Sequence, residues 1–198
     1  MAKRIFDLVV AGLALVLLSP LMLGIALWIR FDSPGSALYR QERVGRFGRL
    51  FQIHKFRTMS EAGSTGAMQL TVGPDPRITR AGRVLRRTKL DELPQLWDVL
   101  VGDMSLVGPR PEVPKYVALY PADLRDKVLS VRPGMTDRAS IEYREENELL
   151  ARAVDPERAY IEVVMPAKLR YAAEYVDRRS MWLDLCLIGA TVQTLWLR

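Results

Sequence analysis

The stretch LVVAGLALVLLSPLMLGIALWI at residues 8–29 decides the fold of this chain, because 22 consecutive residues carry no charged side chain. As one unbroken α-helix it would be about 33 Å long, enough to cross a hydrocarbon core of about 30 Å. A cleaved signal peptide is disfavoured, since its apolar region is usually shorter, about 7–15 residues. Moreover, WIRF at 28–31 stands where a small-residue cleavage site would follow. The stretch therefore predicts a membrane helix.

Two features favour a helix that enters the membrane and returns. Pro20 lies near the middle of the stretch and lacks a backbone N–H, so it bends or breaks the helix there, and the Ser19 hydroxyl is one candidate partner for a freed carbonyl. Basic residues flank both ends, with Lys3 and Arg4 before the stretch and Arg30 after it, and basic flanks prefer the cytoplasmic side. We expect residues 1–30 to form a re-entrant hairpin broken at Ser19-Pro20; a proline-kinked spanning helix stays open as the alternative.

The remaining composition limits the chemistry. With 49 % hydrophobic and 26 % charged residues, the 198-residue chain is a folded protein with room for one core. Cys186 is the single cysteine, which excludes an internal disulfide and a cysteine-based zinc cluster. His54 is the single histidine, which excludes multi-histidine metal sites. We expect Cys186 to be a small buried apolar side chain and His54 to be structural, which leaves carboxylates, cations and backbone groups for chemistry.

The positive charge is concentrated in one stretch. The net charge of +6 divides into +1 for residues 1–29, +9 for residues 30–89 and −4 for residues 90–198. A basic stretch directly after an apolar helix is typical of a surface that meets phosphates, whether of lipid, nucleotide or nucleic acid.

The rest of the chain, residues 31–198, is expected to be a small cytosolic α+β domain that is mostly helical, with little strand. Residues 50–59 predict a strand that places Lys55 and Arg57 on one face, side by side, as suits a phosphate. Residues 60–76 read as a long polar loop. Helical patterns cover residues 77–88, 93–100, 112–129 and 155–177, and 181–197 is either a core helix or a helix at the membrane interface.

The densest charged cluster is RRTKLDELP at 86–94. One interpretation is purely structural: Thr88 and Asp91 have the spacing of a helix capping box, and Pro94 suits the first turn of the helix.

The other interpretation is chemical. The Asp91 carboxylate, near Arg86 and Lys89, is expected to have a lowered pKa and to stay ionised. It could then attack phosphorus and form an acyl phosphate. The neighbouring Glu92 could help to hold Mg²⁺, which would neutralise phosphate oxygens.

A second cluster is GPRPE at 108–112. Pro109 and Pro111 fix the backbone around Arg110, which would present its guanidinium to a phosphate or carboxylate. The alternative is an ordinary helix start with a solvated arginine. RPGMT at 132–136 has the composition of a plain turn.

In combination these segments resemble the monotopic phosphoglycosyl transferases of the bacterial sugar transferase family. The matching segments are the apolar hairpin with Ser19-Pro20, KFRTM at 55–59, TKLDELPQLWDVL at 88–100, SLVGPRP at 105–111 and RPGMT at 132–136. The resemblance covers essentially the whole chain. LDELPQL together with VGPRP is its most specific part.

The resemblance implies a re-entrant membrane helix and a catalytic domain on the cytoplasmic face of the bacterial inner membrane. The implied reaction moves a sugar-1-phosphate from a UDP-sugar to a polyprenol phosphate such as undecaprenyl phosphate, releasing UMP. It would follow a ping-pong course and would be the first membrane step of glycoconjugate assembly. Asp91 would be the nucleophile and Glu92 its partner, and both would contribute to a Mg²⁺ site.

The resemblance also implies a binding pocket. Arg110 with Pro109 and Pro111 would hold the donor phosphate or uridine, and Lys55, Arg57 and Arg86 would line the anionic pocket. The partners would be the UDP-sugar, the polyprenol phosphate and membrane lipid. A homodimer is possible under this interpretation, and nucleic acid is not expected as a partner.

The chain departs from the family pattern in two ways. It begins directly at the hairpin, like a minimal catalytic unit, and it has DRASIE at 137–142 where many members carry a glycine and an Asn-Gly-Arg-type segment. The sugar is therefore left unassigned. Two other functions stay open: a Mg²⁺-dependent phosphohydrolase that uses the same Asp-Glu pair, and a membrane-anchored module that binds anionic lipid. Nucleic acid is disfavoured because aromatic residues are sparse among the cations of 77–89.

Overall fold

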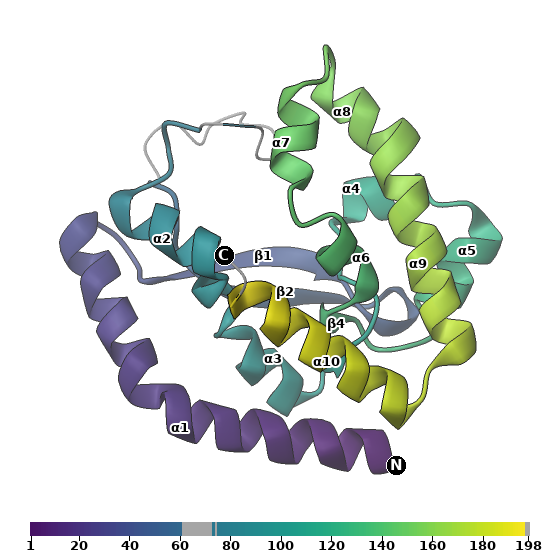
Figure 1. Cartoon of the computed structure of the whole chain (residues 1–198), viewed down its shortest axis with the longest axis horizontal. Coiled ribbons are helices and arrows are strands. Elements are labelled where there is room, and N and C mark those ends of the chain that lie inside the picture. Colours follow the sequence, from purple (N-terminus) through teal and green to yellow (C-terminus); the bar gives the residue numbers. More distant parts are fainter. Residues whose placement is uncertain (61–72, 74, 197–198) are drawn as a thin grey trace.

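The computed structural model describes residues 1–60, 73 and 75–196, and its fold is the expected mostly helical α+β type (Figure 1). The long N-terminal helix α1 (Ala2–Asp32) is followed by the strands β1 (Leu38–Val44) and β2 (Leu50–Phe56). Next come α2 (Arg80–Thr88), the 3₁₀ turn η2 (Leu90–Glu92), α3 (Gln95–Val101), β3 (Ser105–Val107), α4 (Pro114–Val117), α5 (Ala122–Val128) and β4 (Gly134–Thr136). The C-terminal part contains α6 (Arg138–Glu142), α7 (Glu146–Ala151), α8 (Pro156–Ala159), the π-helical turn η3 (Tyr160–Val164), α9 (Met165–Arg178) and α10 (Met181–Trp196).

Helix α1 bends part way along its length and wraps around one side of the domain (Figure 1). Pro20 lies inside the helix and has no N–H to donate to the carbonyl of Val16, four residues earlier. The Ser19 hydroxyl donates to that carbonyl instead, at 2.8 Å. The helix-break-helix expected at Ser19-Pro20 therefore takes the form of a bend inside a continuous helix, with the freed carbonyl satisfied as expected.

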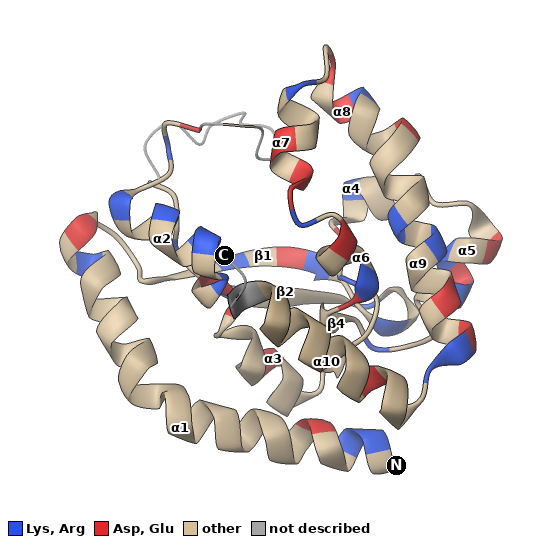
Figure 2. Cartoon of the chain, in the orientation of Figure 1, with Lys and Arg blue, Asp and Glu red and all other residues tan. Residues whose placement is uncertain are grey.

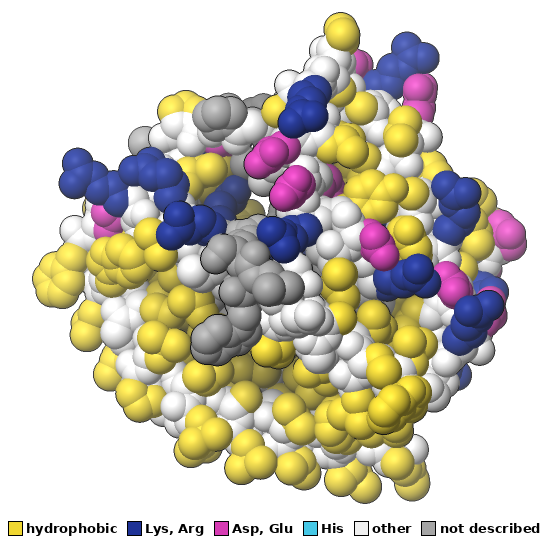
Figure 3. Space-filling model, in the orientation of Figure 1, with side chains coloured by type: hydrophobic (Ala, Val, Ile, Leu, Met, Phe, Trp, Pro, Cys, Tyr) yellow, Lys and Arg dark blue, Asp and Glu magenta, His cyan; other side chains and the backbone are white. Residues whose placement is uncertain are grey.

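Most of the apolar surface of α1 faces outward. Val16 and Leu17 are 73 % and 76 % exposed, whereas Ala11, Ile25 and Ile29 are buried against the domain. Charged residues on α1 lie near its two ends (Figure 2), and hydrophobic side chains gather along the edge of the molecule where α1 and α10 lie (Figure 3). Among the described residues α1 is the one helix long and apolar enough to cross a membrane, a test that core helices and signal sequences also pass.

The two longer strands form an antiparallel hairpin in which Tyr39 pairs with Lys55. Strand β2 ends at Phe56, earlier than the predicted strand, and most of the predicted loop at 60–76 lies outside the described residues. His54 is structural, as expected: its Nδ1 lies 2.6 Å from Asp98 Oδ1, and its backbone N–H donates to Asp98 Oδ2 at 2.9 Å.

A short parallel pair, β3 with β4, forms where the sequence predicted only a turn. The two strands approach so closely that a Cβ on Gly134 would lie 2.1 Å from the backbone nitrogen of Gly108. Glycine is therefore required at this crossing. The pair fixes the start of the Gly108–Glu112 segment, and Gly134 N–H donates to Pro109 O at 2.9 Å.

The predicted helix at 112–129 is wrong as one element, because α4 and α5 are separate helices. Pro121 lies between them, and a proline disfavours helical backbone at the residue before it. The predicted helix at 155–177 is confirmed as α8, η3 and α9 in direct succession. Pro166 cannot donate to the carbonyl four residues earlier, which accounts for a π-helical turn at this place.

Helix α10 packs one face against the core, as one of the two predictions for residues 181–197 expected, and leaves its other face exposed. Asp184 and Leu187 are buried on its inner face, while Trp182 and Leu185 are 75 % and 46 % exposed on the outer face. Cys186 is exposed, so the expectation of a buried cysteine is wrong. The α10 pattern has no polar face, so the sequence did not reveal which side packs inward.

Candidate active site

The charged cluster at 86–94 folds as a tight turn between two helices. Lys89 has a positive φ of 58° and ends α2, and the 3₁₀ turn of Leu90–Glu92 follows. The Thr88 hydroxyl donates to Val84 O at 2.8 Å, at the end of α2, so Thr88 does not cap a following helix and the predicted capping box is wrong. The Asp91 and Glu92 carboxylates are therefore not committed to capping.

Asp91 is 9 % exposed, and its Oδ1 has no hydrogen-bond partner in the described part of the chain. Burial, reinforced by the charge of Glu92, raises the pKa of Asp91, while Lys55 and Lys89 oppose the shift. The expected lowering of the Asp91 pKa is therefore wrong. An unpaired carboxylate oxygen in a buried setting is costly for the fold, and such oxygens are typical of functional sites.

Glu92 has the opposite environment. Its Oε1 accepts from Lys55 Nζ at 3.0 Å and from Arg110 Nη2, and its Oε2 accepts from Arg110 Nη1 at 3.3 Å. Burial alone would raise the pKa of Glu92, but the charges of Arg110 and Lys55 outweigh it and hold this pKa well below its usual range. Glu92 is therefore the ionised carboxylate of the pair.

Arg110 reaches Glu92 from the proline-flanked segment, as the sequence suggested for a presented guanidinium. Its backbone N–H donates to Asp137 Oδ2 at 3.3 Å, and its Nη1 lies 3.5 Å from Met135 O. The Glu92 charge raises the pKa of Arg110. The segment is extended and α4 begins only at Pro114, so Arg110 is not a solvated residue at a helix start.

The other predicted cations divide into two groups. Lys55 and Arg86 lie beside the carboxylates, and burial lowers the pKa of each. The charge of Glu92 opposes this shift for Lys55, and the charge of Asp91 opposes it for Arg86. Arg86 Nε donates to Thr58 Oγ1 at 2.9 Å. Arg57 borders the same cavity, but its guanidinium donates to Ser33 O at 2.7 Å and to the carbonyl of Pro34. Arg57 thus ties β2 to the end of α1.

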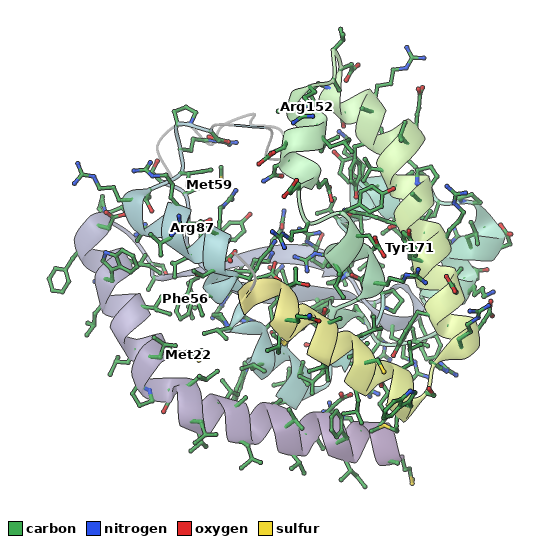
Figure 4. The ribbon with its side chains drawn as sticks, in the orientation of Figure 1. Met22, Phe56, Met59, Arg87, Arg152 and Tyr171 are labelled. Atoms are coloured by element: carbon green, nitrogen blue, oxygen red, sulfur yellow. The ribbon has the colours of Figure 1, made fainter. Side chains whose placement is uncertain are left out.

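Two cavities meet at the Glu92–Arg110 pair. The larger, of about 950 Å³, contains Asp91, Lys55 and Arg86 in its wall. The smaller, of about 320 Å³, is lined by Pro109 and Pro111 and extends toward α6, α9 and α10. Met59 and Arg87 mark the β2–α2 side of the larger cavity in Figure 4, and Arg152 marks the end of α7 opposite.

The sequence analysis missed one cation of this site. Arg144 lines both cavities, is half-buried, and has no hydrogen bond or ion pair with any other described residue. It lies between α6 and α7, more than fifty residues from Asp91, and no local motif marks it. Only the packing of these helices brings it to the site.

The carboxylates of the site fit Mg²⁺ only in part. No group of three or more acidic, histidine or cysteine side chains that could hold a metal occurs among the residues the structure describes. Mg²⁺ at phosphate-transfer sites is usually held by one or two carboxylates together with substrate phosphates. The Asp91 carboxylate offers such a ligand, whereas both Glu92 oxygens already accept hydrogen bonds from cations.

The described residues thus form a site suited to phosphate groups, on a domain with a long apolar helix. Asp91 has a buried oxygen without a partner among them, Glu92 is neutralised by two cations, and Arg144 has no partner among them. The chain belongs to the bacterial sugar transferase family, whose sequence profile matches residues 1–198.

Curated relatives match along nearly the whole chain. One is the UDP-N-acetylgalactosamine-undecaprenyl-phosphate N-acetylgalactosaminephosphotransferase of Aeromonas hydrophila, 35 % identical over 98 % of this chain and 43 % of the relative. The UDP-glucose:undecaprenyl-phosphate glucose-1-phosphate transferase of Caulobacter vibrioides is 39 % identical over 98 % of this chain and 69 % of the relative. The exopolysaccharide production protein ExoY of Rhizobium meliloti is 34 % identical over 97 % of this chain and 84 % of the relative. The chain spans about two fifths of the Aeromonas relative and of the Escherichia coli glucose-1-phosphate transferase.

Proposed function

We propose that this protein transfers a sugar-1-phosphate from a UDP-sugar to a polyprenol phosphate such as undecaprenyl phosphate and releases UMP. The observation that carries the proposal is the unpaired Oδ1 of the buried Asp91 beside a neutralised Glu92. The activities of the Aeromonas and Caulobacter relatives support the donor and acceptor classes.

The proposed reaction has two displacements at one phosphorus atom. Asp91 Oδ1 attacks the phosphorus that bears the sugar, and the bond from this phosphorus to the bridging oxygen breaks, so that UMP leaves with the electron pair. An oxygen of the lipid phosphate then attacks the same phosphorus. The bond to Asp91 breaks, which restores the carboxylate and yields the lipid diphosphate sugar.

The cations have different roles in this proposal. Lys55 and Arg110 neutralise Glu92, which keeps its charge from repelling an anionic donor near Asp91. Arg144 has no hydrogen bond or ion pair with another described residue, so it can bind a donor phosphate without breaking a contact with any of them. Arg110 lines both cavities, and Pro109 and Pro111 line the smaller one, so this segment supports a donor that lies across the Glu92–Arg110 pair.

Mg²⁺ is part of the proposal through Asp91, and Glu92 would contribute by exchanging a cation contact for the metal. When bound, the metal would neutralise charge on the phosphate oxygens. The protein's own contribution is to keep Asp91 Oδ1 unpaired and to surround it with Lys55 and Arg86.

A re-entrant topology on the cytoplasmic face is proposed for α1, because both of its ends contact the same domain. Arg4 donates to Val99 O at 2.6 Å near the start of the helix. At the other end, Asp32 Oδ2 accepts from the backbone N–H of Ala81 at 3.0 Å. If α1 spanned the membrane, its two ends would lie on opposite sides of a hydrocarbon core about 30 Å thick. A single domain on one side could not contact both ends.

The test is UMP release from a panel of UDP-sugars by the full chain in lipid vesicles, with and without polyprenol phosphate. We expect Asp91→Asn to abolish both release and a covalent phosphosugar adduct, and Asp177→Asn, an exposed carboxylate far along α9, to retain them. Sustained turnover without the lipid would indicate a phosphohydrolase. Anionic-lipid binding without UMP release would indicate a binding module. A covalent phosphosugar adduct on the Asp91→Asn variant would refute Asp91 as the nucleophile.

A further inference from the structure

Helix α1 carries a buried carboxylate in its first two turns. Asp7 is 2 % exposed. Its Oδ2 accepts from the Ser105 hydroxyl at 2.8 Å, and its Oδ1 accepts from the backbone N–H of Leu106 at 3.3 Å. Ser105 and Leu106 belong to β3, the strand that leads directly to Arg110. The carboxylate therefore connects the apolar helix to one side of the active site.

A second connection reaches the same strand through α10 and α9. Lys3 Nζ donates to Asp184 Oδ2 at 2.6 Å and lies 4.0 Å from Asp7 Oδ1. The Tyr175 hydroxyl lies 2.8 Å from Asp184 Oδ1 and 3.1 Å from the carbonyl oxygen of Val107. The two buried carboxylates are thus held by one lysine, two hydroxyl groups and one backbone N–H, in a network that joins α1, α9 and α10 to β3.

A third connection reaches the other side of the site. Arg4 Nη1 donates to Val99 O at 2.6 Å, and its Nη2 donates to Leu100 O at 2.9 Å. These are carbonyls of the last turn of α3, which have no partner within the helix. Helix α3 directly follows the turn that carries Asp91 and Glu92. Arg4 therefore fixes the position of the helix that supports the two carboxylates.

We propose that Lys3, Arg4 and Asp7 are positioning residues that set Arg110 against Glu92, so that turnover depends on how the apolar helix is seated. The inference rests on the proposed function for its kinetic readout. None of the three residues lines either cavity, so they act through β3 and α3. A displacement of about 1 Å at a reacting group can cost about 100-fold in rate, which makes these fixed contacts consequential.

The experiment compares Asp7→Ala and Ser105→Ala with the conservative variants Asp7→Asn and Ser105→Thr, in the full chain in lipid vesicles. Val164→Ala is the matched control, because Val164 is fully buried in the α4–α9 core and lines neither cavity. We expect both alanine variants to lower kcat by about tenfold or more and to raise KM for the UDP-sugar, because Arg110 lines both cavities. The conservative variants should recover most of the rate, and Val164→Ala should lower Tm without this loss of kcat.

Amide hydrogen exchange gives a readout that needs no turnover. Asp7→Ala should speed exchange at residues 105–112, including the Arg110 amide that donates to Asp137, and Val164→Ala should not. Unchanged exchange there, or a kcat loss that Val164→Ala reproduces at equal Tm, would overturn the positioning role. Absence of UMP release from the wild-type protein would instead refute the proposed function, while the exchange result would still decide the inference.

Discussion

Lys55 Nζ lies 3.0 Å from Glu92 Oε1, and Arg110 donates to both oxygens of the same carboxylate. Glu92 is therefore paired, whereas the adjacent Asp91 keeps Oδ1 unpaired. Two adjacent carboxylates in one turn thus have different surroundings: Glu92 is ionised and paired with cations, whereas Asp91 has one oxygen without a hydrogen-bond partner in the described part of the chain. The separation depends on which way each side chain points from the 3₁₀ turn.

Glu92→Gln should destabilise the fold. The substitution leaves the half-buried Lys55 and Arg110 without a counter-charge. Breaking a fully buried pair typically costs about 3–5 kcal/mol, and the loss here should be smaller because solvent reaches both cations. Because the pKa of folded Glu92 is depressed, its stabilisation is complete above the unfolded pKa and is lost as pH falls toward the folded pKa. Urea unfolding from neutral to acidic pH measures this; an unchanged midpoint at neutral pH would contradict it.

Asp91→Asn should have the opposite effect on stability and should abolish turnover. We expect Tm to rise by a few degrees, because asparagine occupies the same buried position without a charge that must be removed from water. The raised pKa of folded Asp91 means that its ionised form opposes folding at neutral pH, and this penalty disappears as pH falls through the raised pKa. Thermal unfolding of the variant beside Asp177→Asn tests the sign. A Tm well below that of the wild type would show that the Asp91 carboxylate stabilises the fold.

The rate of the UMP-releasing step should fall on acidification at a pH above the ordinary titration range of aspartate, about 3.9. The reason is that burial raises the pKa of Asp91, and in the proposed mechanism only its carboxylate form attacks phosphorus. Single-turnover UMP release across pH measures the midpoint, with Tm recorded at each pH to separate unfolding. A midpoint at or below the ordinary aspartate value would rule out the titration of a buried Asp91.

Arg144→Gln should raise KM for the UDP-sugar about tenfold, consistent with loss of one charge-assisted hydrogen bond. Its Tm should stay close to that of the wild type, because Arg144 has no described partner to abandon. Arg110→Gln should lower Tm as well, since it breaks the pair with Glu92. Arg152→Gln, an exposed arginine outside both cavities, is the control. Equal KM values for Arg144→Gln and Arg152→Gln would show that Arg144 does not bind the donor.

Pro20→Ala should straighten α1, because alanine restores the N–H that can donate to Val16 O and removes the ring that bends the helix. Cysteine labels at Ala2 and Pro34, in a Cys186→Ser background, should react from the same side of the membrane in the parent protein. In the Pro20→Ala variant, we expect one of the two labels to react from the opposite side of the membrane. Labels that react from opposite sides in the parent protein would refute the re-entrant topology.

The sequence by itself determined the features that depend on neighbouring residues. The apolar stretch at 8–29, its bend at Pro20 and the Ser19 hydroxyl on Val16 O follow from helix geometry over one turn. The presentation of Arg110 between two prolines was likewise predictable, because proline restricts the backbone on both sides of it. The Asp91-Glu92 pair was visible as adjacent carboxylates among cations.

Tertiary structure decided what depends on distant segments. The β3–β4 pair joins strands about thirty residues apart, which no turn signature reveals. Burial, a property of the assembled fold, raises the pKa of Asp91 against the effect of the nearby cations. The packing of α6 and α7 brings Arg144 to the cavities, and that of α1 on β3 buries Asp7. These contacts form only after distant segments meet, so local sequence pattern carries no signal for them.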